Sequence, residues 1–199
     1  ILEDMLYFKP YESEYFSLGD KPVIFDFGAN LGFYSCAMAK RFPHARIVAV
    51  EAHPQNFEYL KKNIIQNGLE DRITAVHAAR VGTARKTVTI HDHASDVGSH
   101  SLIAEKEGVT GTAHEVPAIT VDALLKEYAI DTVDFLKMDI EGGEYDIVKN
   151  GQEVFPKIRN LAMEYHVIPG EQVEDMRMKL ESFGFKISNH SANIWHGVR

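Results

Sequence analysis

Short apolar runs alternate with amphipathic stretches along most of the chain. The runs are rich in residues that favour β-strands, and in the stretches between them apolar residues recur at helical spacing. Strands are predicted at 23–27, 46–51, 72–79, 133–140 and 158–167, a final antiparallel pair at 185–188 and 194–198, and helices at 33–41, 54–63, from 120, 145–149 and 171–183. Sequential βα units of this kind predict an α/β fold with a doubly wound, mostly parallel seven-stranded sheet and helices on both faces.

Two segments depart from this alternation. Residues 1–18 mix aromatic and acidic side chains, and we expect them to form an N-terminal strap or helix that packs on the domain 19–199. Between about 82 and 117 the pattern changes to strand-like alternation at 86–93, then to a polar stretch, and then to a short strand near 115–120. A β-rich insertion that passes near the mouth of the ligand site is expected here.

The segment between the first strand and the first helix carries the strongest local signal, because it reads D-F-G-A-N-L-G from Asp26 to Gly32. Gly28 and Gly32 would let the backbone approach a ligand, and the first helical N–H groups would point at it. A dinucleotide loop needs a glycine where Asn30 stands, so this loop favours a cationic, hydrogen-bonding ligand such as S-adenosylmethionine. An ordinary turn in which Asp26 caps the backbone would also fit.

The next two strands end in residues that suit an adenosine group. Glu51 ends the second strand, where an acid can hydrogen-bond ribose hydroxyls in both dinucleotide and S-adenosylmethionine sites. A solvated glutamate at a strand end is the alternative. Ala78 and Ala79 end the third strand and would leave room for the adenine base, although core packing explains them equally well.

Acids lie near the carboxyl ends of four of the predicted strands, where open α/β sheets bind their ligands: Asp26, Glu51, Asp139 and Glu164. His166 lies two residues after Glu164, so both side chains would point to the same side. Asp139 or His166 could accept the proton of a hydroxyl during an in-line methyl transfer. Alternatively, the acids could hold a divalent metal, or Asp139 and Glu141 could only cap a helix.

Composition limits the classes of partner. The 199 residues carry a net charge of −8 and no run of lysine or arginine, which disfavours a nucleic acid. The single cysteine, Cys36, excludes a cysteine zinc site and fits a reducing compartment, so a cytoplasmic location without a membrane span is expected. No metal is expected, because a pair such as His91 and His93 on one face of a strand more often forms a solvated edge.

Four elements together give the chain a family resemblance: D-x-G-A-N-x-G-x-Y-S from Asp26 to Ser35, Glu51, K-M-D-I-E-G-G-E from Lys137 to Glu144, and Glu164-x-His166. With these elements, from about Gly19 to His166, the chain resembles the FkbM-type methyltransferases. Several methyltransferase groups share the first element, whereas the last two are more specific. One departure is Ala52-His53-Pro54, since the family usually has a proline directly after the acid.

The resemblance implies a Rossmann-like class I methyltransferase fold and the use of S-adenosyl-L-methionine, mostly to O-methylate hydroxyls of sugars, glycosides and secondary metabolites. A small-molecule or carbohydrate acceptor is therefore expected. Cofactor contacts are implied at Asp26, Gly28, Asn30, Gly32 and Glu51, and an active-site role at Asp139 and Glu141. From the same loops we also expect cofactor contacts at Ala29, Tyr34, Ser35, Ala52, Ala79 and Asp139, and a catalytic role for His166.

Three other functions fit less well. A nicotinamide-dependent oxidoreductase would need the G-x-G-x-x-G loop. A nucleic-acid methyltransferase would carry an N-P-P-Y-like motif after the fourth strand, together with basic surface. A protein that binds S-adenosylmethionine without catalysis stays open, although Asp139, Glu141 and His166 argue against it.

Overall fold

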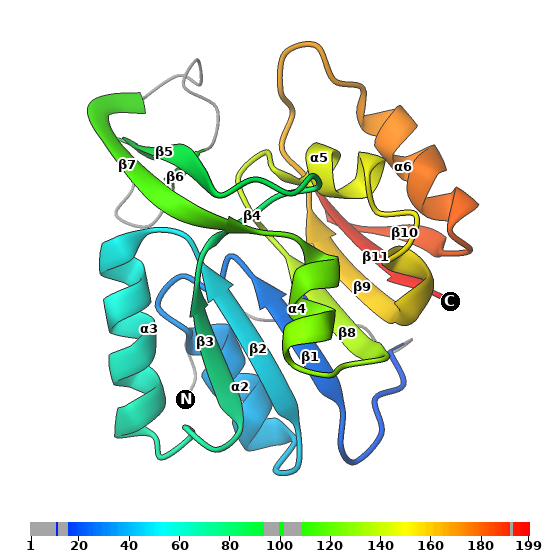
Figure 1. Ribbon diagram of the computed structural model, residues 1–199. Helices are drawn as coiled ribbons and strands as arrows, with labels where there is room; N and C mark the ends of the chain where they lie inside the picture. The colour runs from blue at the N-terminus through cyan, green and yellow to red at the C-terminus, as the bar shows by residue number, and fades with distance from the viewer. Residues whose placement is uncertain (1–10, 12–15, 94–99, 102–108, 192) are drawn as a thin grey trace.

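The fold is built on a seven-stranded sheet with the order β10-β11-β9-β8-β1-β2-β3 (Figure 1). This computed structural model describes residues 11, 16–93, 100–101, 109–191 and 193–199. Five strands run parallel: β1 (Val23–Phe27), β2 (Arg46–Glu51), β3 (Ile73–His77), β8 (Val133–Met138) and β9 (Ile158–Glu164). β11 (Ile194–Val198) runs antiparallel to both β9 and β10 (Lys186–Ser191). The predicted mostly parallel sheet with a terminal antiparallel pair is therefore confirmed.

Helices cover both faces of this sheet. α2 (Phe33–Arg41) and α3 (Pro54–Gln66) pack on one face, and α4 (Val121–Glu127), α5 (Glu144–Lys149) and α6 (Val173–Ser182) on the other. The strand β1 is apolar on both sides because it lies between these two layers of helices. Ile24 belongs to the core under α2 and α3, whereas Phe25 and Phe27 belong to the core under α4, α5 and α6.

Two helix ends follow from local signals in the sequence. Thr120 caps α4, because its hydroxyl oxygen accepts a hydrogen bond from the Ala123 N–H, as its position predicts. α3 begins with Pro54 at its first turn and ends before Gly68, which has a φ of 63°. None of the helices in the described ranges is long and apolar enough to cross a membrane.

A second sheet, with the order β4-β7-β5-β6, lies across the carboxyl ends of β2 and β3 (Figure 1). Its strands are β4 (Ala79–Arg80), β5 (Thr87–His93), β6 (His100–Ser101) and β7 (Val109–Ile119). The strand predicted at 72–79 was too long, because the main sheet ends at His77 and Ala79 pairs with Ala118 of β7. The strand predicted near 115–120 was too short, since pairing with β5 extends β7 back to Val109.

Parts of two predicted segments lie outside the described residues. These are most of the N-terminal strap and the polar stretch 96–99. Of the strap, the ring of Phe16 packs against Phe135 at a centroid distance of 5.1 Å, on the α2 side of the main sheet.

Candidate functional site

The loop between β1 and α2 is held close to the ends of two other strands. Gly28 has a φ of 76°, and a Cβ added there would lie 1.7 Å from the carbonyl oxygen of Asp139. Gly32 has a φ of 82°, and a Cβ there would lie 2.4 Å from the side chain of Leu60. The N–H groups of Gly28 and Ala29 both donate to the Val50 carbonyl at 3.0 Å. The loop therefore needs glycine at both positions to fit between β2, β8 and α3.

The carboxylate of Glu51 is fixed at the end of β2 by two backbone donors. The Asn30 N–H donates to one carboxylate oxygen and the His53 N–H to the other, each at 2.8 Å. The side chain is buried, which raises the pKa of the Glu51 carboxyl, and the two backbone donors offset part of this rise. Each oxygen keeps a second lone pair, so the carboxylate could still accept hydrogen bonds from a diol.

A buried ion cluster lies beneath the loop. The Lys137 ammonium donates to the Gly28 carbonyl at 2.7 Å and lies 3.5 Å from Asp26 and 3.6 Å from Asp139. The Ser35 hydroxyl donates to the other Asp26 oxygen at 2.6 Å. Burial disfavours the ammonium, but the carboxylates of Asp26 and Asp139 outweigh it and raise the pKa of Lys137. Asp26 has no exposed surface, so here it holds Lys137 and the first helix.

Tyr11 joins the acids at the ends of β8 and β9. Its hydroxyl lies 3.0 Å from an Asp139 oxygen and 2.8 Å from a Glu164 oxygen. A phenol carries one proton, so the two acids share a single donor. Burial and then the two carboxylates raise the pKa of Tyr11, which keeps the phenol neutral. Its ring also contacts the ring of Tyr34 at a centroid distance of 5.8 Å.

His166 is oriented by a buried carboxylate. Its Nδ1 lies 3.1 Å from Glu144 Oε1, and its Nε2 lies 3.5 Å from Glu141 Oε2. Glu144 is fully buried and also accepts a hydrogen bond from the Ile140 N–H at 3.1 Å. Burial alone would lower the pKa of His166, but Glu144, Glu141 and Asp139 together raise it. With the proton on Nδ1 donated to Glu144, Nε2 is available as a proton acceptor.

The structure brings most of the predicted site residues into two neighbouring groups. Asp139, Glu141 and His166 each place one polar atom within 4.8 Å of the other two. The loop residues gather around Glu51 and Asp26, as described above. Ala52 and Ala79 lie further along, where they pack together beside the buried Ile90 and Val116 of the second sheet.

Three residues of the site were not assigned a role from the sequence. Glu144 belongs to the same K-M-D-I-E-G-G-E element as Asp139 and Glu141, and this was the available signal. Lys137 was visible as a lone lysine in an apolar strand, which usually means a buried ionic partner. Nothing in the sequence around Tyr11 indicates that its hydroxyl meets Asp139, because that contact spans 128 positions.

Comparisons with known proteins find a family model and relatives that match most of the chain. A family model described as the methyltransferase FkbM domain matches residues 26–187. The methyltransferase sdnD of Sordaria araneosa is 27% identical over 208 residues, which cover 88% of this chain and 78% of that protein. The 31-O-demethyl-FK506 methyltransferase FkbM of Streptomyces tacrolimicus is 21% identical over 201 residues, which cover 88% and 77%.

A solved structure shares the fold. The methyltransferase FkbM from Methylobacillus flagellatus superposes with a TM-score of 0.65 at 17% sequence identity. The superposition covers 98% of this chain and 47% of that chain, so this chain spans about half the length of that protein.

Proposed function

Because the chain belongs to the FkbM methyltransferase family, we propose that it transfers the methyl group of S-adenosyl-L-methionine to a hydroxyl oxygen of a small molecule, such as a sugar or a glycoside. The observation that carries the proposal is His166, whose Nδ1 is held by the buried Glu144 while Nε2 lies beside Glu141. An oriented imidazole of this kind is what removal of a proton from a poor acid requires. One matched relative is named for its action on 31-O-demethyl-FK506, which supports an oxygen acceptor.

The groups at the carboxyl ends of β1 and β2 suit such a cofactor. Glycine at positions 28 and 32 lets the loop pack closely against Asp139 and Leu60, and the doubly anchored Glu51 carboxylate beside it suits a ribose diol. We assign cofactor contacts to Gly28, Ala29, Asn30, Gly32 and Glu51, with Ala52 and Ala79 towards the base. Tyr34, Ser35 and Asp26 would support the loop from beneath. When bound, the cofactor supplies an electrophilic methyl group on a sulfonium.

The residues at the ends of β8 and β9 would perform the acid–base part of the reaction. During methyl transfer to the acceptor oxygen, His166 Nε2 would take up the proton that the hydroxyl loses. Glu144 holds the opposite nitrogen and stabilises the imidazolium that forms. Asp139 and Glu141 border the path of the acceptor, where they can orient its hydroxyl groups.

The cofactor assignment is tested by titrating the protein with S-adenosylhomocysteine and, separately, with NAD. We expect binding of S-adenosylhomocysteine alone, and Glu51→Gln should weaken it about 10–100-fold because hydrogen bonds to a charged group are lost. Isothermal titration calorimetry measures both affinities. Glu58→Gln, which changes an exposed acid on α3, is the matched control and should bind like the wild type. Binding of NAD alone, or an unchanged affinity in Glu51→Gln, would overturn the assignment.

The rate should depend on pH through His166. Only the neutral imidazole accepts a proton, so kcat should fall as the pH drops through the pKa of His166, which lies above the ordinary 6.5. Glu144→Gln removes the strongest pKa-raising partner, so the acid limb should move to lower pH while the plateau rate falls. A kcat profile between about pH 5 and pH 9 shows this. His44→Gln, at an exposed histidine, should leave the limb in place. An acid limb that stays unshifted in Glu144→Gln would contradict the assignment.

A further inference from the structure

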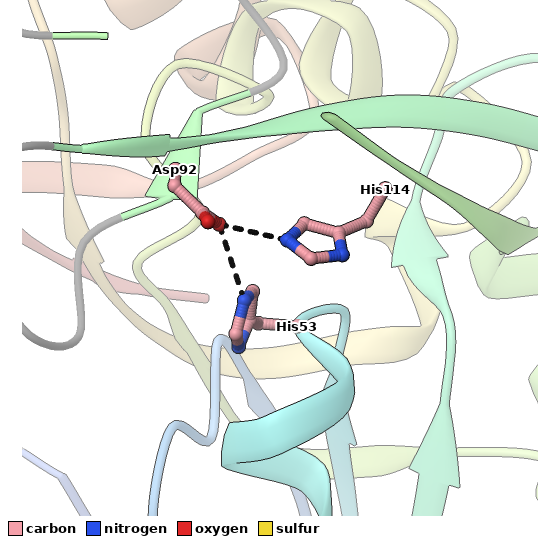
Figure 2. Close-up of side chains that lie close together, drawn as sticks. All are labelled: His53, Asp92 and His114. Carbon is pink, nitrogen blue, oxygen red and sulfur yellow. Dashed lines mark hydrogen bonds and ion pairs between the residues drawn. The ribbon is translucent and has the colours of Figure 1, made fainter. Parts of the chain in front are cut away.

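Three side chains connect the second sheet to the segment that follows Glu51 (Figure 2). His53 comes from the start of α3, Asp92 from β5 and His114 from β7. One oxygen of Asp92 lies 3.2 Å from His53 Nε2 and 3.0 Å from His114 Nε2. The three polar atoms all lie within 4.8 Å of one another.

We propose that His53, Asp92 and His114 bind a divalent transition-metal ion of the zinc type. Two imidazole nitrogens and one carboxylate oxygen form a ligand set that suits zinc. Bonds of about 2.0–2.1 Å in a tetrahedral site place neighbouring ligand atoms about 3.3 Å apart. The two contacts of Asp92, at 3.0 and 3.2 Å, are already close to that spacing, so small side-chain movements would admit the ion.

The backbone positions the ligands before any ion arrives. His53 is the residue before the first turn of α3, and its N–H is fixed by the Glu51 carboxylate. Across the β5–β7 ladder, His114 pairs with Ile90, and Asp92 lies two residues further along β5, where the register shifts between His91 and His93. The side chains of Asp92 and His114 are each 28% exposed, whereas that of His53 is 8% exposed. An ion and a water ligand could therefore reach the site from the exposed side.

A cluster held only by hydrogen bonds is the alternative, with both imidazoles donating to Asp92. One contact favours this hydrogen-bonded cluster. The Asn56 N–H donates to His53 Nδ1 at 3.5 Å, which requires that Nδ1 carries no proton. A metal on Nε2 would move the proton to Nδ1 and remove this contact. Because 3.5 Å is at the outer limit of a hydrogen bond, its loss costs little compared with a bond to zinc.

The other group of this kind in the described ranges is Asp139, Glu141 and His166. That group already contains a cation, because the Lys137 ammonium lies 3.6 Å from Asp139. Its imidazole is also the proposed base. The group around Asp92 is therefore the better candidate for a metal, in contrast to the expectation from the sequence that none binds.

The proposal is tested by titrating the full chain with Zn²⁺ alone. The protein carries no histidine tag and is first treated with a chelator to remove bound metal. Calorimetry should show one ion per chain with a dissociation constant below about 10 µM. Co²⁺ should give the visible absorption of a tetrahedral site, and Mg²⁺ should not bind because it prefers oxygen ligands. Asp92→Asn and His114→Ala should each weaken Zn²⁺ binding at least about 100-fold.

The matched control is His91→Ala, which removes an imidazole from the residue directly before Asp92 on β5 and should bind Zn²⁺ like the wild type. Circular dichroism checks that each variant is folded. Failure of the wild type to bind Zn²⁺ would overturn the proposal, and so would unchanged binding in folded Asp92→Asn. If both variants fail to fold, the Co²⁺ spectrum of the wild type decides, because absence of tetrahedral bands would also overturn it. None of these readouts depends on methyl transfer, so the metal site and the proposed function can fail separately.

Discussion

Replacing His166 with alanine is expected to lower kcat by about 10²–10⁴-fold, the usual contribution of a general base. The affinity for S-adenosylhomocysteine should stay within about twofold, since His166 is grouped with Asp139 and Glu141 and is not among the residues proposed to contact the cofactor. The measurement is transfer of a labelled methyl group to the best acceptor from a screen of sugars and small hydroxylated metabolites. Calorimetry on the same protein gives the cofactor affinity.

A double-mutant cycle with Glu144 separates a catalytic role from a structural one. Glu144→Gln keeps an oxygen that can accept from the Ile140 N–H but removes the charge that stabilises an imidazolium. If Glu144 acts only through His166, the double variant should be about as slow as His166→Ala alone, because residues that work as a unit are not additive. Additive losses in kcat would contradict this coupling. Wild-type activity in His166→Ala would contradict the assignment of His166 as the base.

Labelled-donor assays also address the alternative of a protein that binds cofactor without catalysis. Tight binding of S-adenosylhomocysteine combined with no transfer to any hydroxyl in the screen would favour that alternative. Transfer that depends on His166 and Glu144 would favour the enzyme. The same screen identifies the acceptor, which the family name leaves open.

The sheet could be predicted from the sequence because each parallel strand carries its signal locally. Ile24, Phe25 and Phe27 are apolar on both sides of β1 since helices cover both faces, and that pattern is readable without coordinates. The turn after β1 could also be predicted from the sequence, because Gly28 marks a position that tolerates no side chain. The structure confirms this requirement, since Gly28 has a positive φ and lies against the Asp139 carbonyl. Local patterns of this kind predict the fold and the loop between β1 and α2.

Contacts between distant segments were not readable in the same way. From the sequence, His91 and His93 formed the histidine pair to consider, because they alternate on one strand. The structure instead gathers His53, Asp92 and His114 from a helix start and two strands, through a β5–β7 register that no local pattern fixes. The contact of Tyr11 with Glu164 is of the same kind, since it joins residues 153 positions apart in the sequence.

Lys137→Met is expected to lower the free energy of unfolding by about 3–5 kcal/mol, the usual cost of removing one partner from a buried ion pair. The ammonium lies within 3.6 Å of the carboxylates of Asp26 and Asp139 and donates to the Gly28 carbonyl. Without it, the buried Asp26 carboxylate keeps the Ser35 hydroxyl as its one hydrogen-bond donor among the described residues. Urea unfolding monitored by circular dichroism measures the change. The free energy of unfolding of a small domain is about 5–15 kcal/mol in total, so the expected loss is a large fraction of it.

Two further variants show whether the loss comes from the ion cluster. Lys126→Met, at an exposed lysine on α4 that pairs with Asp122, should change stability by no more than about 0.5 kcal/mol. Asp26→Asn combined with Lys137→Met should recover part of the loss, because no unpaired charge then remains at Asp26. If Lys137→Met is no more destabilising than Lys126→Met, the cluster does not hold the Gly28 loop. The expected large loss, partly recovered, would instead show that the ion cluster beneath the Gly28 loop depends on Lys137 for its stability.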